Sequence, residues 1–159
     1  MSMKEHLRIL FVCHGNICRS PMAEFILKDM AEKQGISDRL TVASAATSSE
    51  EILGERGNPV YPPAKAELAA HGISCEGKYA VLLRASDYAR YDLIIGMDSA
   101  NIRNMHRLFG GDSQGKIRKM MDYTDRGGDV ADPWYSDRFD IAYRDIYDGC
   151  VGLMREIHK

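Results

Sequence analysis

Residues 13–20 bring together side chains that can bind and attack an anion. The segment reads Cys-His-Gly-Asn-Ile-Cys-Arg-Ser and directly follows an apolar run. Gly15 and Asn16 tolerate the positive φ that a nest of inward-pointing backbone N–H groups requires. Arg19 offers a planar guanidinium whose paired N–H donors suit phosphate oxygens. At the base of such a nest, close to a helix N-terminus, Cys13 has surroundings that favour the thiolate. The segment therefore predicts a phosphate site with a sulfur nucleophile.

A second segment, residues 130–137, supplies an acid for the same chemistry. When a phosphoryl group moves to a thiolate, the departing oxygen needs a proton, and a carboxylic acid on a facing loop can donate it. Asp132 is the candidate for this role. Trp134 and Tyr135 cannot both point into one core, so at least one should face a cleft. An aromatic ring stacked there gains about 1 kcal/mol beyond its burial.

The elements around these segments indicate an α/β fold. Residues 6–13 form a continuous apolar run, as expected of a strand that is buried on both faces. Further strands are predicted at 39–46, 92–98 and, most weakly, 116–123. Helices are predicted at 20–35, 62–73, 86–92, 99–109 and 136–159, with Ser20 as N-cap and Pro21 in the first turn of the first one. Alternating strands and helices imply a parallel sheet covered on both sides, with ligands bound beyond the carboxyl ends of the strands.

The bulk properties limit the possible functions. A chain of 159 residues is the length of one ordinary domain, and we expect residues 1–159 to form it. A net charge of −2 without a long basic block gives no footprint for nucleic acid or for an anionic membrane surface. No apolar run is long enough to span a bilayer or to act as a signal peptide. We expect a cytoplasmic protein with reduced cysteines. A monomer is the default, with weak self-association through the aromatic residues as an alternative.

The two segments together resemble the low-molecular-weight protein tyrosine phosphatases. Cys13, five intervening residues, Arg19 and Ser20 match the phosphate-binding loop of that family, and Gly15, Asn16 and Cys18 also fall where the family has them. The Asp-Pro-Trp-Tyr stretch beginning at Asp132 matches the segment that carries the family's general acid. The resemblance extends from residue 7 to residue 158 through three further stretches: Ser-Ala-Ala-Thr (44–47), His-Gly-Ile (71–73) and Asp-Leu-Ile-Ile-Gly-Met-Asp (92–98).

This resemblance implies a single-domain three-layer sandwich around a four-stranded parallel sheet of order 2-1-3-4. It also implies hydrolysis of phosphotyrosine and small aryl phosphates in two steps, without metal or cofactor. Cys13 would be the nucleophile, Arg19 would stabilise the phosphoryl oxygens, and Asp132 would act as general acid and then as general base. The substrates would be tyrosine-phosphorylated proteins, and a tyrosine kinase is one possible partner. The rest of the phosphate-binding loop would be His14, Gly15, Asn16, Ile17, Cys18 and Ser20.

The resemblance also implies several supporting roles, and for each of these residues there is a plainer structural alternative. Ser20 would donate a hydrogen bond to the Cys13 thiolate as well as cap a helix. The side chain of Asn16 would tie the loop to Ser44 on the second strand. His71 would lie against Asn16, although a histidine at a helix end is common. Asp98 would likewise support the loop; the plainer alternative is that it only caps a helix.

Two further features concern redox chemistry and substrate choice. Cys18 would form a reversible disulfide with Cys13 that shields it from irreversible oxidation; the plainer alternative is a packing thiol. Where several family members have an aromatic residue on the loop after the second strand, this chain has Thr-Ser-Ser-Glu-Glu (47–51), with Glu50 nearest that position. One wall of the substrate cleft would then be polar and acidic, and acidic substrate flanks would be disfavoured.

Three other functions fit the sequence less well than hydrolysis does. Arsenate reduction on the same fold uses two more cysteines close together after the loop, but Cys75 and Cys150 are isolated, and residues 78–92 contain none. A phosphate-binding adaptor or anti-sigma-like module without turnover is disfavoured because nucleophile, arginine and acid are all present. A zinc site made by Cys13, His14 and Cys18 lacks a second pair of ligands.

Overall fold

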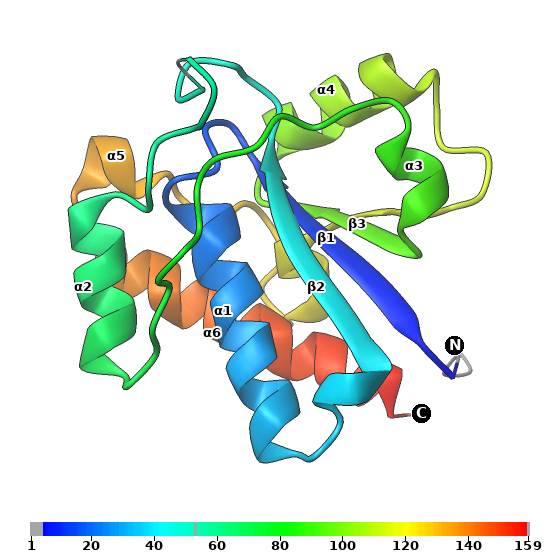
Figure 1. Ribbon diagram of the computed structural model, residues 1–159. Coiled ribbons are helices and arrows are strands. Elements are labelled where there is room, and N and C mark those ends of the chain that lie inside the picture. The colour runs from blue at the N-terminus through cyan, green and yellow to red at the C-terminus, as the bar shows by residue number, and fades with distance from the viewer. Residues whose placement is uncertain (1–4, 53, 159) are drawn as a thin grey trace.

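The computed structural model describes residues 5–52 and 54–158 of the chain. Its sheet has four strands, all parallel, in the order β2-β1-β3-β4, as predicted (Figure 1). The strands are β1 (Leu7–Cys13), β2 (Leu40–Ala46), β3 (Leu93–Gly96) and β4 (Ile117–Lys119). β1 therefore lies inside the sheet, between β2 and β3.

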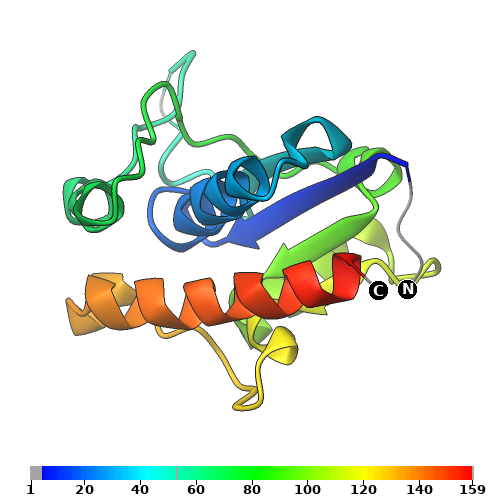
Figure 2. The same cartoon turned by 90° about the horizontal axis from the view of Figure 1, so that it is seen from below.

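Helices cover both faces of this sheet. On one face α1 and α6 pack against each other, and α2 packs against both; on the other, α4 contacts β3 and β4. Figure 2 shows that α6 extends along most of the length of the molecule. The helical elements are α1 (Arg19–Lys33), η1 (Ser37–Arg39), α2 (Pro62–Ala70), α3 (Asp87–Arg90), α4 (Ser99–Phe109), η2 (Met120–Tyr123), α5 (Pro133–Ser136) and α6 (Phe139–Ile157).

The apolar run of β1 is continuous because its two faces enter different cores. Ile9 and Phe11 belong to the large core beneath α1 and α6. Leu10 and Val12 point the other way, into the smaller core that also contains Met105 of α4. All four of these β1 side chains are almost fully buried. Successive residues of a strand face opposite sides, so a strand covered on both sides needs apolar residues throughout.

Two glycines let α6 approach η2 closely. A Cβ atom at Gly152 would lie 1.9 Å from the carbonyl oxygen of Tyr123. At Gly149 it would lie 2.6 Å from the Cε atom of Met120. Because a side chain at Gly152 would collide with the Tyr123 backbone and one at Gly149 would crowd Met120, the turn after β4 packs closely on α6.

The structure corrects several predicted boundaries. The first helix begins at Arg19 with Cys18 as its N-cap, so Ser20 lies in the first turn and is not the cap. The predicted strand at 116–123 ends at Lys119, and the chain then turns into η2. The predicted helix at 136–159 begins at Phe139, because Asp137 has a left-handed backbone that ends α5. Its predicted last residue, Lys159, lies outside the described residues. Neither η1 nor α5 was predicted.

Among the helices within residues 5–52 and 54–158, none is both long enough and apolar enough to cross a bilayer.

Candidate active site

The loop between β1 and α1 forms the floor of the candidate site. Cys13 is the last residue of β1 and Arg19 the first of α1, so the loop lies at the carboxyl end of the sheet, as predicted. Asn16 has a left-handed backbone, with a φ of 58°. At Gly15, a Cβ atom would lie 3.2 Å from the Cγ atom of Glu51, so the absence of a side chain also gives room to the facing loop. The chain therefore turns sharply enough to bring its N–H groups towards the sulfur of Cys13.

Three hydrogen-bonding groups converge on the sulfur of Cys13. This residue is only 3% exposed. The backbone N–H groups of Asn16 and Ser20 donate to Sγ at 3.3 and 3.4 Å, and the Ser20 hydroxyl lies 3.0 Å away. The Ser20 N–H belongs to the first turn of α1, where backbone donors have no partner inside the helix. The sulfur takes up this free donor at the positive end of the helix dipole, which favours negative charge on sulfur.

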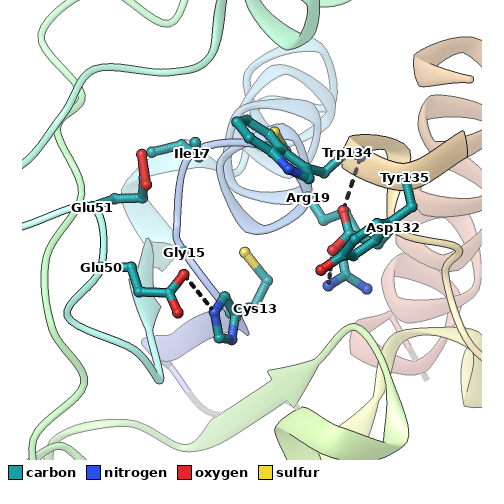
Figure 3. A pocket seen from close by; sticks show the side chains of 11 residues that line it. Cys13, Gly15, Ile17, Arg19, Glu50, Glu51, Asp132, Trp134 and Tyr135 are labelled. Atoms are coloured by element: carbon teal, nitrogen blue, oxygen red, sulfur yellow. Dashed lines mark hydrogen bonds and ion pairs between the residues drawn. The ribbon is translucent and has the colours of Figure 1, made fainter. Parts of the chain in front are cut away.

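Arg19 is held beside the sulfur by acceptors from distant parts of the chain. Its residue is 3% exposed. Nη1 donates to Oδ2 of Asp98 at 2.8 Å and to the carbonyl oxygen of Val130 at 2.9 Å. Burial works against the charge of the guanidinium, but Cys13, Asp98 and Asp132 together outweigh it and raise the pKa of Arg19. The arginine is therefore a fixed cation, clamped on one side and facing the cavity with the other (Figure 3).

Asp132 lines the cavity beside Arg19, where α5 begins (Figure 3). Its Oδ1 atom accepts the backbone N–H of Trp134 at 3.0 Å and so caps this short helix. Its Oδ2 atom lies 3.6 Å from Nη2 of Arg19. A carboxyl group fixed in this way, on an element that faces the sulfur, is placed to exchange a proton with a group bound between them.

A cavity of about 340 Å³ is lined by the predicted catalytic residues and the predicted cleft residues. Trp134 and Tyr135 form its outer rim and are 55% and 87% exposed. The ring of Trp134 packs on Tyr61, with centroids 4.8 Å apart, whereas Tyr135 is free to contact a bound ring. The side chains around the cavity are shown in Figure 3: Cys13, His14, Gly15, Ile17, Cys18, Arg19, Glu50, Glu51, Asp132, Trp134 and Tyr135.

The wall opposite the aromatic rim is polar, as predicted from the residues around Glu50. Oε2 of Glu50 lies 3.0 Å from Nε2 of His14, and both side chains are more than half exposed. Glu51 also lines the cavity, a position that the sequence did not single out. Two carboxylates thus stand at the mouth, whereas the cation deeper inside, Arg19, is already paired with Asp98.

Cys18 lies in the same cavity but in different surroundings from Cys13. It is buried, and burial, assisted by the nearby Cys13, raises the pKa of its thiol to about 12. Cys18 therefore stays protonated under conditions in which a thiolate is needed for attack. All four cysteines are free thiols in the structure.

The side-chain amide of Asn16 ties the loop together in the way the resemblance implies. Nδ2 donates to Oγ of Ser20 at 2.8 Å and to Oγ of Ser44 at 2.9 Å, while Oδ1 accepts the backbone N–H of Val81.

The supporting role expected for His71 is not found. Its Nε2 lies 3.1 Å from Oε2 of Glu67, one turn back on the same helix, and its ring stacks on Tyr143 of α6 with centroids 3.8 Å apart. The amide of Asn16 is meanwhile fully used by other groups. The end of α2 directs the histidine towards α6, so this prediction is corrected.

Two other side chains, and a second contact of Asp98, extend the site beyond what the sequence indicated. Asp98 does cap α4, accepting the backbone N–H of Asn101, but it is also the main partner of Arg19. Glu24 and Lys78 lie behind Ser44, where neither was expected. The only sequence signal for Glu24 was a charged residue within the buried stripe of α1. Within residues 5–52 and 54–158, no group of three or more His, Cys, Asp or Glu side chains is arranged to hold a metal ion.

Comparison with known proteins decides the family. The family model for low molecular weight phosphotyrosine protein phosphatases matches residues 8–159. The chain belongs to this family. It is 36% identical to the low-molecular-weight protein-tyrosine-phosphatase YfkJ of Bacillus subtilis over 155 residues, covering 96% of this chain and 97% of YfkJ. It is 34% identical to the corresponding phosphatase of Schizosaccharomyces pombe, covering 98% and 99%.

Solved structures of similar phosphatases agree with that assignment. The crystal structure of YfkJ superposes with a TM-score of 0.88 at 35% identity, covering 98% of this chain and 96% of that one. The YwlE arginine phosphatase, as a variant with a phosphorylated active-site serine, superposes with a TM-score of 0.81 at 25% identity, covering 96% and 97%. The fold is therefore the family's α/β fold, and the chain is a protein tyrosine phosphatase that acts on phosphoproteins.

Proposed function

We propose that this phosphatase hydrolyses phosphotyrosine in two steps through a phosphocysteine on Cys13. The observation that carries the proposal is the convergence of three groups on one cavity. The sulfur of Cys13 receives the N–H groups of Asn16 and Ser20, Arg19 is buried beside it, and Asp132 lies across from it. A sulfur nucleophile, a fixed cation and a proton donor are the parts that phosphoryl transfer requires.

In the first step the Cys13 thiolate attacks phosphorus, so that a sulfur–phosphorus bond forms while the phosphorus–oxygen bond to tyrosine breaks. Arg19 and the loop N–H groups stabilise the charge on the non-bridging oxygens. Asp132 gives its proton to the departing phenolic oxygen, and tyrosine leaves past Trp134 and Tyr135. The positive field comes from the backbone and the guanidinium, so this step needs no metal ion.

In the second step water attacks the phosphocysteine. Asp132, now ionised, takes a proton from this water, a phosphorus–oxygen bond forms and the sulfur–phosphorus bond breaks. Sulfur leaves as a thiolate, and the Ser20 hydroxyl, 3.0 Å from it, donates a hydrogen bond that stabilises the charge. Inorganic phosphate then departs and the site returns to its starting state.

The enzyme would act as a single domain on tyrosine-phosphorylated proteins in a reducing compartment. Residues 1–159 would serve as one catalytic domain without a cofactor. The substrates would be tyrosine-phosphorylated proteins, with a tyrosine kinase as one candidate. The four free thiols fit a reducing compartment such as the cytoplasm, where Cys13 stays active. Self-association would be weak at most.

One other substrate is favoured by a specific observation. Glu50 and Glu51 line the mouth of the cavity and could pair with a guanidinium, and the similar YwlE is an arginine phosphatase. Against this, Ile17 and the two aromatic residues of the rim offer apolar contacts that suit a phenyl ring. Phosphotyrosine is therefore the first substrate to test, and phosphoarginine the second.

Arsenate reduction is less well supported by the positions of the other thiols. Cys150 is fully buried in α6, where its thiol faces the carbonyl oxygen of Ala23, and Cys75 is buried as well. Neither lines the cavity, so neither is placed to carry a disulfide from Cys13 to the surface.

The deciding experiment compares the wild type, Cys13→Ser and Asp132→Ala. Each is assayed with p-nitrophenyl phosphate, a phosphotyrosine peptide and a phosphoarginine peptide, beside arsenate reduction with thioredoxin. We expect the wild type to hydrolyse the phosphotyrosine peptide best and Cys13→Ser to be inactive. Asp132→Ala should lose most activity on phosphotyrosine and less on p-nitrophenyl phosphate, because nitrophenolate leaves more easily without a proton. Unchanged hydrolysis by Cys13→Ser would refute the mechanism.

A further inference from the structure

A buried carboxylate stands behind the phosphate-binding loop and outside the proposed chemical steps. Glu24 is in α1 and is 5% exposed. Its Oε1 atom accepts the hydroxyl of Ser44 at 2.6 Å, and its Oε2 atom lies 2.6 Å from Nζ of Lys28. Nζ of Lys78 lies 3.6 Å from Oε1 and also donates to the carbonyl oxygen of Ser44 at 2.9 Å. A buried charge is costly unless it is paired, and two lysines pair this one.

Hydrogen bonds connect this carboxylate to the sulfur of Cys13. The sequence of contacts runs from Glu24 to Ser44, then to the Asn16 amide, then to Ser20, and from Ser20 to Sγ. Each contact is between 2.6 and 3.0 Å, so none of them needs a bridging water. The four polar side chains of this network, Glu24, Ser44, Asn16 and Ser20, are all buried.

The direction of each hydrogen bond follows from the number of hydrogens available. An ionised carboxylate only accepts, so the single hydroxyl hydrogen of Ser44 points to Glu24. Oγ of Ser44 can then only accept from the Asn16 amide. The amide orientation is itself fixed, because Oδ1 of Asn16 accepts the backbone N–H of Val81 at 3.0 Å. Both hydrogens of Nδ2 are therefore committed, one to Ser44 and one to Ser20.

The same count of hydrogens gives the direction of the hydrogen bond between Ser20 and Cys13. Because Ser20 Oγ accepts from Asn16, its own hydrogen is free for another partner, and Sγ of Cys13 is 3.0 Å away. Ser20 is then the donor and sulfur the acceptor, which is the arrangement that stabilises a thiolate. With the Ser44 hydrogen turned towards Asn16, the amide could not donate to Ser44, and Asn16 would lose one of the two hydrogen bonds that hold its Nδ2 atom against Ser20.

We propose that Glu24 is a positioning residue: held by Lys28 and Lys78, it orients the network so that Ser20 donates its hydrogen bond to the Cys13 thiolate. This deepens the proposed function, because it rests on Cys13 being the nucleophile. Glu24 touches neither substrate nor sulfur and acts only through Ser44, Asn16 and Ser20. Lys78 pairs with the carboxylate and anchors the end of β2 through the Ser44 carbonyl.

The test measures the thiolate of Cys13 without any substrate. The rate at which iodoacetamide alkylates Cys13 is followed from pH 4 to 9 by peptide mass spectrometry in the wild type, Glu24→Gln and Ser44→Ala. The carboxamide of Glu24→Gln is the same size but brings N–H donors, so it no longer fixes the Ser44 hydrogen. We expect the midpoint of alkylation to move to higher pH by about one unit in both variants, a tenfold smaller thiolate fraction below it. Glu32→Gln, on the exposed side of the same helix, is the matched control and should follow the wild type.

A double variant separates this role from a merely structural one. In a Ser20→Ala background, Glu24→Gln should cause no further change in the alkylation profile, because the last link is already missing. A profile unchanged in Glu24→Gln, or an equal additional change in the Ser20→Ala background, would overturn the proposal. If Glu24→Gln does not fold, Ser44→Ala, which keeps all three charges, decides the matter in the same way. Failure of the proposed function would show separately, as hydrolysis by Cys13→Ser, because the alkylation assay needs no turnover.

Discussion

Replacing Asp98 should separate the clamping of Arg19 from the capping of α4. Oδ2 of Asp98 accepts Nη1 of Arg19 at 2.8 Å, while Oδ1 accepts the backbone N–H of Asn101, also at 2.8 Å. Asparagine caps helices as well as aspartate does, so Asp98→Asn keeps the cap but replaces the charged acceptor that faces Arg19 with an amide NH2 group. Asp98→Ala removes both. The two variants thus differ by one interaction whose contribution is known from other helices.

The expected stability losses follow from the burial of Arg19. A hydrogen bond between charged groups contributes about 1.5 to 3 kcal/mol, and Arg19 is almost fully buried, so Asp98→Asn should lower the free energy of unfolding by about 2 kcal/mol. Asp98→Ala should lose about 1 kcal/mol more, because the cap is lost too. Urea unfolding measures both, and Asp38→Asn, an exposed aspartate in η1, is the control.

Both Asp98 variants should also lose catalytic activity, because Arg19 would no longer be held in its position. With only the Val130 carbonyl holding Nη1, the guanidinium can swing towards Asp132, whose Oδ2 lies 3.6 Å from Nη2. A misplaced cation costs about 100-fold in rate, so we expect kcat/KM for p-nitrophenyl phosphate to fall 10- to about 100-fold in both variants. The cap does not matter for this step, so the two should be similar. If Asp98→Asn kept the wild-type kcat/KM while losing stability, the carboxylate would not be positioning Arg19.

Three further predictions concern other parts of the fold. Gly152→Ala places a methyl group against the Tyr123 carbonyl and should lower the free energy of unfolding by about 3 kcal/mol in a urea titration; a loss below 1 kcal/mol would contradict the close packing. Peroxide should inactivate the enzyme by oxidising Cys13 to a sulfenic acid, which the Cys18 thiol attacks with loss of water, so dithiothreitol should restore the wild type; equal recovery in Cys18→Ser would refute this. Glu50→Gln should raise kcat/KM about threefold for phosphotyrosine peptides with acidic flanks but not for neutral ones, and the gain should shrink at high salt.

The parts of the site that could be predicted from sequence are those that are local. Cys13, Asn16 and Arg19 lie within seven residues, and the geometry of a strand, a tight turn and a helix start follows from the residue types themselves. Asp132 could be predicted because a proline and two aromatic residues mark its segment. The sheet order came from the resemblance, since alternation alone leaves the order of the strands open.

The parts that were missed depend on tertiary packing. The resemblance placed His71 against Asn16, but the direction in which a helix end points is decided by the helix it packs on, here α6 with Tyr143. Lys78 reaches Ser44 from an extended segment whose path the sequence does not fix. Asp98 has the pattern of a helix cap, and nothing in that pattern shows that its second oxygen binds Arg19. Asp98 has two acceptor oxygens: one caps α4, and the other binds Arg19, which is distant in the sequence.

The order of the strands explains why these distant partners meet at the loop. β1 lies between β2 and β3, and all three strands are parallel, so their carboxyl ends come together at one edge of the sheet. Ser44 near the end of β2 therefore flanks the loop on one side, and Asp98, two residues after β3, flanks it on the other. The first orders the hydrogen bonds to sulfur, and the second holds the cation. Any fold with β1 at an edge of the sheet would lose one of these two supports, so the central position of the first strand is a requirement of the site as well as of the core.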